Sequence, residues 1–279
     1  MFSGSLPATR AAVAHLDPWF VTVARAAIGG VLALGLIVVR RPPVPHAHLG
    51  TLALIVLCLV IGFPAMLAIA SVTVPAAHGG VILGLLPLAT AIAAVPLAGE
   101  RPSLFFWVLS LIGAGLVVAF ALRDGNAAVV TGDIFIALAV TLTGVGYTLS
   151  GVMSRTIPGW TVIAWALVLS LPPTAIATWW LWPANAASVP LSAWLGLIYV
   201  GAVAQFIGYA AWNAALAIGG VARIGQLQLI QPFATIALAA IFLGETIDAE
   251  MIGFALAVGL VVALGRRAAI GLRAPPPPG

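Results

Sequence analysis

The chain alternates long apolar runs with short breaks of arginine, proline, glycine or acidic residues. Each run is about as long as a helix that crosses a bilayer, which takes roughly 20 apolar residues. The runs fall at about residues 19–39, 49–72, 76–98, 104–121, 134–154, 161–182, 194–217, 222–243 and 251–264. This pattern predicts an all-α protein that crosses a membrane many times.

One apolar segment occurs twice. PLATAIAAVPLAGE at Pro87–Glu100 returns as PFATIALAAIFLGE at Pro232–Glu245, with proline, alanine, threonine, glycine and glutamate in register at an offset of 145 residues. GLVVA at 115–119 recurs at 259–263 after a slip of one residue. The chain is therefore predicted to consist of two homologous halves.

The same offset aligns the N-terminus with a later helix. Phe2 aligns with Tyr147, and Arg10 aligns with Arg155, at the end of the run 134–154. Met1 then falls in the middle of a helix. We expect a tenth helix whose first half is absent; a short amphipathic N-terminal segment is the alternative. No cleavable signal peptide is expected, because no basic start precedes an apolar core.

Ten helices divide into two repeats of five, at residues 1–123 and 131–267, followed by a disordered basic and Pro-rich tail at 268–279. Because five is odd, the second repeat enters the membrane from the opposite face, so the repeats are inverted. With both termini in the cytoplasm, eight of eleven arginines and one acid, Glu100, fall on the cytoplasmic side. This obeys the positive-inside rule and predicts a multi-pass protein of the cytoplasmic (inner) membrane.

The composition excludes several other classes. With 63% hydrophobic and 6% charged residues, the chain has too little polar surface for a soluble globule. The net charge of +4 comes from arginines scattered at helix ends, so no nucleic-acid partner is expected. Cys58 is the only cysteine, and no phosphate-binding loop, HExxH motif or acid pair occurs. We therefore expect no catalytic residues, metal or cofactor.

These features resemble the drug/metabolite transporter superfamily, specifically its EamA-type members. The resemblance lies in two five-helix repeats, each with a mid-helix proline followed thirteen residues later by the glutamate of a GE pair. Further matches are FSGS at 2–5, Arg25, GERPS at 99–103 and YAAWNAAL at 209–216. The resemblance implies a central cavity between two bundles and the export of small metabolites; YddG-type amino-acid exporters are relatives. The late start of the first helix departs from the family.

Polar side chains inside spans are costly and are therefore candidate functional groups. They form stripes at helical spacing on three of the predicted helices. Substrate contact is predicted for Tyr147, Gln205, Tyr209, Asn213 (or its neighbour Trp212), Gln228 and Gln231. The alternative is that such side chains only join helices to one another.

His78 and Arg223 occupy equivalent positions in the two repeats, each in a first helical turn, and are predicted to gate or couple transport. Interfacial capping by His78 and snorkelling of Arg223 to lipid phosphates are the alternatives. Pro87 and Pro232 are predicted hinges, because proline loosens the helical hydrogen-bond ladder. All seven acids map to loops or helix ends, so no carboxylate relay is expected; either His78 carries a coupling proton or transport is uncoupled.

The sequence thus predicts a secondary transporter that exports small metabolites such as amino acids by alternating access. Its partners are a small-molecule metabolite and membrane lipids, with monomer and homodimer both open. A lipid flippase or scramblase of the same architecture is one alternative. An integral membrane enzyme acting on lipid is another.

Overall fold

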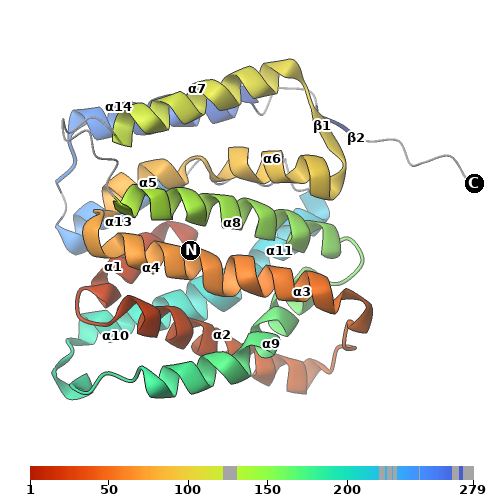
Figure 1. The fold of residues 1–279 in the computed structure, drawn as a ribbon, viewed down its shortest axis with the longest axis vertical. Helices are drawn as coiled ribbons and strands as arrows, with labels where there is room; N and C mark the ends of the chain where they lie inside the picture. The colour runs from red at the N-terminus through yellow and green to blue at the C-terminus, as the bar shows by residue number, and fades with distance from the viewer. Residues whose placement is uncertain are drawn as a thin grey trace, which may run out of the picture.

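The computed structural model describes residues 1–121, 131–219, 224, 228, 231–244, 246–265 and 270–272, and these are almost entirely helical (Figure 1). In chain order the elements are η1 (Phe2–Gly4), α1 (Ser5–Val13), α2 (Pro18–Arg40), η2 (His46–His48), α3 (Leu49–Ile55), η3 (Val56–Gly62), α4 (Phe63–Thr73), α5 (Ala76–Leu83), α6 (Leu86–Ala98), β1 (Glu100–Pro102), α7 (Leu104–Ala121), α8 (Thr131–Met153), α9 (Gly159–Trp180), η4 (Ala186–Ser188), α10 (Leu191–Ile198), η5 (Tyr199–Gly208), α11 (Tyr209–Gly219), α13 (Gln231–Leu243), α14 (Ala249–Gly265) and β2 (Ile270–Leu272).

Within the described part of the chain, six helical stretches are long and apolar enough to cross a membrane. They are Pro18–Arg40, His46–Thr73, His78–Ala98, Thr131–Met153, Gly159–Trp180 and Leu191–Leu216. The outer surface is apolar as well: Leu104, Trp179 and Ile218 are each at least 79% exposed. In water such exposure would be costly, whereas lipid tails cover it. The prediction of an integral, multi-pass helical protein is confirmed.

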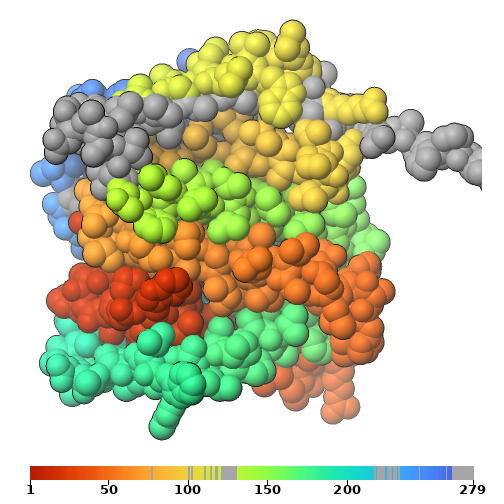
Figure 2. All heavy atoms as spheres, viewed as in Figure 1, coloured from red at the N-terminus to blue at the C-terminus, as the bar shows by residue number. Residues whose placement is uncertain are grey.

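The helices pack in layers along the long axis of the molecule (Figure 1). α7 packs on α14 at the top of the view, and α2 packs on α9 at the bottom. Between these layers α8 contacts both α4 and α6, while α5 contacts α13. Figure 2 shows the side chains of α3 and α4 and those of α8 as adjacent orange and green rows on one face.

Two of the spanning stretches contain π-helical segments. η3 lies inside His46–Thr73, and η5 lies inside Leu191–Leu216. Shifted by 145 residues, η3 corresponds to residues 201–207, which lie within η5. π-helical turns are rare and are frequent at functional sites. The two repeats thus share the same uncommon distortion at the same place.

Pro87 follows a break in its helix. α5 ends at Leu83, the residue whose carbonyl a proline at position 87 would clash with, and α6 begins at Leu86. The linking residues Gly84 and Leu85 make i to i−3 hydrogen bonds instead of the α-helical pattern. Pro232 is the second residue of α13, just as Pro87 is the second residue of α6.

Glycines end the two equivalent helices. Gly99 and Gly244, 145 residues apart, have φ angles of 72° and 65°, the left-handed conformation that terminates helices. After Gly99, strand β1 pairs antiparallel with β2, at Glu100–Leu272 and Pro102–Ile270. The tail predicted to be disordered therefore includes three residues in a strand, held against the GERPS segment.

Candidate functional site

Four aromatic side chains meet in the interior of the bundle. They come from η1, α8 and α11, and we call Phe2, Tyr147, Tyr209 and Trp212 the aromatic cluster. Phe2 lies 5.3 Å from Tyr209 and 5.9 Å from Trp212, and Tyr147 lies 5.9 Å from Tyr209, measured between ring centroids. Both tyrosines are at most 3% exposed. The rings are in contact, at separations typical of favourable edge and tilted pairs.

The first residues of the chain are fixed beside this cluster. The Tyr199 hydroxyl donates to the carbonyl oxygen of Met1 at 2.7 Å, and the Thr235 hydroxyl donates to that of Ser3 at 3.1 Å. These bonds join η1 to η5 and to α13. Phe2 is therefore held in place by elements from the second half of the chain.

Buried polar atoms without hydrogen-bond partners accompany the aromatic cluster. They include Trp212 Nε1, the Ser150 hydroxyl one turn beyond Tyr147, and both amide atoms of Gln228. The Gln228 side chain is close enough to interact with the Tyr147 hydroxyl, although neither of its amide atoms reaches hydrogen-bond geometry. Such orphaned atoms are rare in proteins. They offer donors and acceptors to a small polar ligand next to apolar rings.

Arg25 adds a buried positive charge to this region. Its side chain is 1% exposed, its Nε and Nη1 have no partner, and it interacts electrostatically with Tyr209. A charge inside a membrane costs about 2.5–3.5 kcal/mol on insertion scales, and such residues are usually functional. Sequence reasoning did not include Arg25 in the site, although a lone arginine inside an apolar run was a sufficient signal.

Gln205 lies where the two π-helices meet. Its Nε2 donates to the carbonyl oxygens of Leu59 and Val60, each at 3.3 Å, and the side chain is fully buried. Val60 is the residue equivalent to Gln205 at the 145-residue offset. Gln205 thus contacts its own equivalent and lies on the boundary between the two halves of the chain.

The remaining predicted contacts lie elsewhere or are not described. Asn213 donates through Nδ2 to the carbonyl oxygen of Gly159 at 3.2 Å, which fixes α11 against the start of α9. Gln231 is partly buried at the start of α13, without a hydrogen bond to the aromatic cluster. Arg223 and Glu245 lie outside the described residues.

His78 forms a second polar site with Asp133. Its Nε2 lies 3.0 Å from Asp133 Oδ1, the two side chains are 12% and 5% exposed, and the Phe120 ring lies 4.5 Å from the imidazole. Asp133 Oδ2 has no hydrogen-bond partner. Asp133 lies at a helix end, as predicted for the acids, but it is buried there because α5 covers the first turn of α8. A carboxylate therefore does lie next to the predicted coupling histidine.

Arg10 binds the end of α4, the helix that precedes His78. Its Nη1 donates to the carbonyl oxygens of Ser71 and Val74 at 3.1 and 2.6 Å, at the end of α4 and four residues before His78. Cations favour the C-terminal end of a helix, where carbonyls are unpaired. The arrangement places a fixed positive charge at the same end of the bundle as His78.

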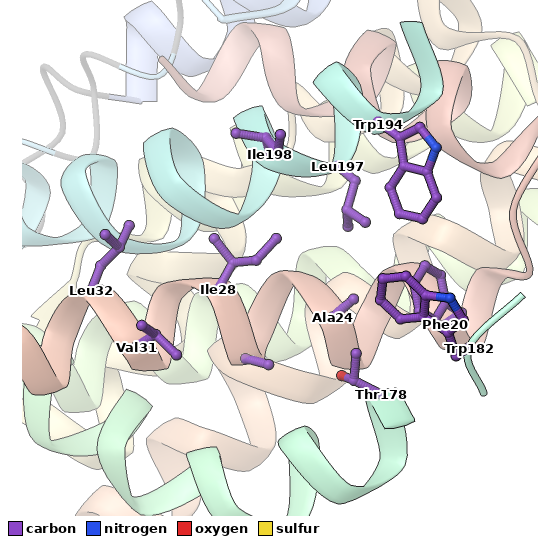
Figure 3. Close-up of a pocket in the computed structure, with 11 residues that line it drawn as sticks. Phe20, Ala24, Ile28, Val31, Leu32, Thr178, Trp182, Trp194, Leu197 and Ile198 are labelled. Atoms are coloured by element: carbon purple, nitrogen blue, oxygen red, sulfur yellow. The ribbon is translucent and has the colours of Figure 1, made fainter. Parts of the chain in front are cut away.

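An apolar groove of about 430 Å³ opens on the outer surface between α2, α9 and α10 (Figure 3). Phe20, Trp182 and Trp194 close one end of it, with Phe20 5.7 Å from Trp182 between ring centroids. Aromatic belts of this kind sit at membrane interfaces. The lining carries almost no polar surface, so the groove suits a lipid chain better than a metabolite. No group of three metal-binding side chains occurs among the described residues.

Comparison with known proteins places this geometry in context. Residues 1–121 and 130–265 each match the model of the EamA-like transporter family. A relative described as an uncharacterized transporter, YdeK of Bacillus subtilis (strain 168), is 43% identical over 268 residues, covering 96% of this chain and 93% of YdeK. A solved protein crystal structure aligns over 95% of this chain and 93% of its own, with a TM-score of 0.67 and 20% identity, which shows the fold alone.

Proposed function

The chain belongs to the EamA-like transporter family, and on that premise we propose that it exports small metabolites, amino acids among them, across the cytoplasmic membrane as a secondary transporter. The observation that carries the proposal is the aromatic cluster with its unpartnered polar neighbours, at the centre of a membrane-spanning bundle. Both repeats contribute, Phe2 and Arg25 from the first and Tyr147, Tyr209 and Trp212 from the second. A small amphiphilic solute fits apolar walls with a few polar groups.

The proposal includes ten helices arranged as two inverted repeats. Helices 145 residues apart pack as pairs, α2 with α9 and α7 with α14, and Gln205 contacts its own equivalent. α14 ends a few residues before β2, which pairs with β1. The other end of this 17-residue helix is about 25 Å away, which supports opposite sides for the turn after Gly244 and the turn after Gly99.

Alternating access then follows from the two repeats exchanging conformations. The break at Gly84 and Leu85 before Pro87 is a place where a helix can bend without losing α-helical bonds. Pro232 is the equivalent residue of the second repeat and stands at the start of α13. We assign both prolines as hinges, and we place both termini in the cytoplasm on the arginine distribution.

Transport into proteoliposomes tests the proposal. The purified protein should accelerate the exchange of radiolabelled amino acids over protein-free liposomes. Tyr209→Ala and Gln228→Ala should each slow this exchange, whereas Arg40→Gln, at the exposed end of α2, should not. Unchanged exchange in both site variants would show that the pocket lies elsewhere.

A lipid flippase is the second candidate, favoured by the apolar groove between α2, α9 and α10. Fluorescent headgroup-labelled lipid in the same proteoliposomes separates the two functions. Headgroup translocation without amino-acid exchange would replace the metabolite transporter with the flippase. Single cysteines placed in GERPS (residues 99–103) and in GETIDAE (residues 244–250), in a Cys58→Ala background, test the inverted topology by labelling. Labelling of both from one side would contradict it.

A further inference from the structure

Arg25 is a buried cation whose Nε and Nη1 have no partner in the described part of the chain. It is the eighth residue of α2, about 10 Å along the helix from its start, and so lies well inside the membrane-spanning part. Among the described residues, no carboxylate forms an ion pair with it. Asp17, the acid nearest in sequence, is used as the N-cap of α2, where Oδ1 accepts from the backbone N–H groups of Trp19 and Phe20.

Two glycines let α2 and η5 pack closely around Arg25. Gly29, one turn farther along α2, allows η5 to approach closely: a Cβ there would lie 3.3 Å from the Gln205 side chain and from the Gly201 carbonyl oxygen. A Cβ at Gly201 would in turn lie 3.1 Å from the carbonyl oxygen of Arg25. These contacts hold the α2 backbone at Arg25 against η5, the segment directly before Tyr209.

Tyr209 connects the cation to the aromatic cluster. It interacts electrostatically with Arg25, and its ring lies 5.3 Å from Phe2 and 5.9 Å from Tyr147. One side of the site therefore offers unpartnered guanidinium donors, and the other offers aromatic faces. A guanidinium fork pairs best with a planar carboxylate.

We propose that Arg25 binds the carboxylate of the transported solute while the aromatic cluster contacts its apolar or aromatic part. This assignment rests on the proposed transport function and narrows its substrate class to small organic anions and zwitterions with an apolar side group. Arg25 is 1% exposed, so neither a solute nor a lipid headgroup reaches it in this conformation. The rings touch one another in this conformation, so the solute separates them when it enters.

The test uses two probes that differ only in the anionic group, N-acetylphenylalanine and its neutral amide. Binding to the full-length protein is measured from the concentration dependence of thermal stabilisation. The acid should bind roughly 10- to 100-fold more tightly than the amide, the gain expected for a hydrogen bond to a charged group. Equal affinity for the two probes, or binding of neither, would overturn the assignment without any variant.

Variants then locate the discriminating group. Arg25→Gln should weaken binding of the acid roughly 10- to 100-fold and leave binding of the amide within about twofold. Arg25→Lys should retain part of the preference, because lysine keeps the charge without the fork. The matched control, Arg40→Gln, removes an arginine from the exposed end of the same helix and should change neither. Equal loss of both probes in Arg25→Gln would indicate a structural role and refute the proposal.

Uptake of the same probes separates this proposal from the transport function on which it rests. Discrimination in binding without uptake above protein-free liposomes supports the anion site and refutes transport. Equal uptake of acid and amide, with Arg25→Gln unchanged, supports transport and refutes the anion site.

Discussion

The pair of His78 and Asp133 gives the most direct quantitative prediction, because its two atoms are 3.0 Å apart and both side chains are largely buried. Removing the imidazole in His78→Ala leaves the Asp133 carboxylate buried, with neither oxygen bonded. Leaving one member of a buried pair unpartnered costs about 3–5 kcal/mol. Hydrogen bonds measured inside membrane proteins average only about 0.6 kcal/mol, so that range is an upper bound.

A double-mutant cycle isolates the interaction. The single variants His78→Ala and Asp133→Ala and the double variant should give a coupling energy of about 1–3 kcal/mol. The contact of the imidazole with Phe120 is lost in both branches that remove His78, so it cancels. Unfolding by SDS in mixed micelles, followed by the fluorescence of the nine tryptophans, provides the free energies. His46→Ala, on the exposed η2, is the matched control and should change stability by less than about 0.5 kcal/mol.

A coupling energy below about 0.5 kcal/mol would refute the reasoning, since it would show that the pair contributes nothing beyond two independent side chains. The same variants bear on energy coupling. If His78 carries a proton, His78→Ala and Asp133→Asn should both lose the dependence of export on a proton gradient while downhill exchange continues. Full gradient dependence in both variants would exclude this pair as the route.

Three further predictions address packing, the predicted contacts and the boundary between the two halves. Gly144→Ala places a Cβ 2.7 Å from the backbone of Ala89 and should lower the free energy of unfolding by about 1–3 kcal/mol in the SDS assay. The control Gly35→Ala, whose Cβ would have nothing within 4 Å, should not lower it. Equal effects of the two would contradict the packing of α6 on α8. Asn213→Ala should lower the free energy of unfolding by about 1 kcal/mol and leave the KM for exchange within twofold, because the Asn213 amide joins two helices. A tenfold rise in KM would instead indicate that Asn213 contacts the substrate. Gln205→Val should change the balance of inward and outward states, measured as cysteine accessibility from each side, and unchanged accessibility would show that its two bonds do not distinguish the states.

The spans could be predicted because lipid leaves few choices. Backbone groups must be satisfied within each segment, so a long apolar run becomes a helix. Most of each predicted run is helical where the structure describes it, apart from the break at Gly84 and Leu85 and the last residue or two of some runs. The αL glycines Gly99 and Gly244 end their helices, as glycine often does. The π-helices η3 and η5 could not be predicted, because an extra residue in the ladder leaves no trace in hydrophobic periodicity.

The site could be predicted only in part, because periodicity assigns a face and not a partner. Tyr147, Tyr209 and Gln228 do come together, as their stripes suggested. Asn213 lies one turn beyond Tyr209 on the same stripe, yet Gly159 from another helix takes its amide. Asp133 looked like an ordinary acid in a first turn, and its burial depends on a segment 55 residues away.

The contact between Gln205 and Val60 links the repeat to the mechanism. If two identical repeats exchanged conformations, the inward and outward states would have equal energy. At this contact the first repeat carries valine and the second carries glutamine, and only glutamine can donate to the carbonyls of the facing π-helix. Under the proposed alternating access, an exchanged conformation would place Val60 where Gln205 now stands and would lose both bonds, so the two states would differ in free energy at this point. Sequence divergence between the halves would then give the transporter a preferred resting state.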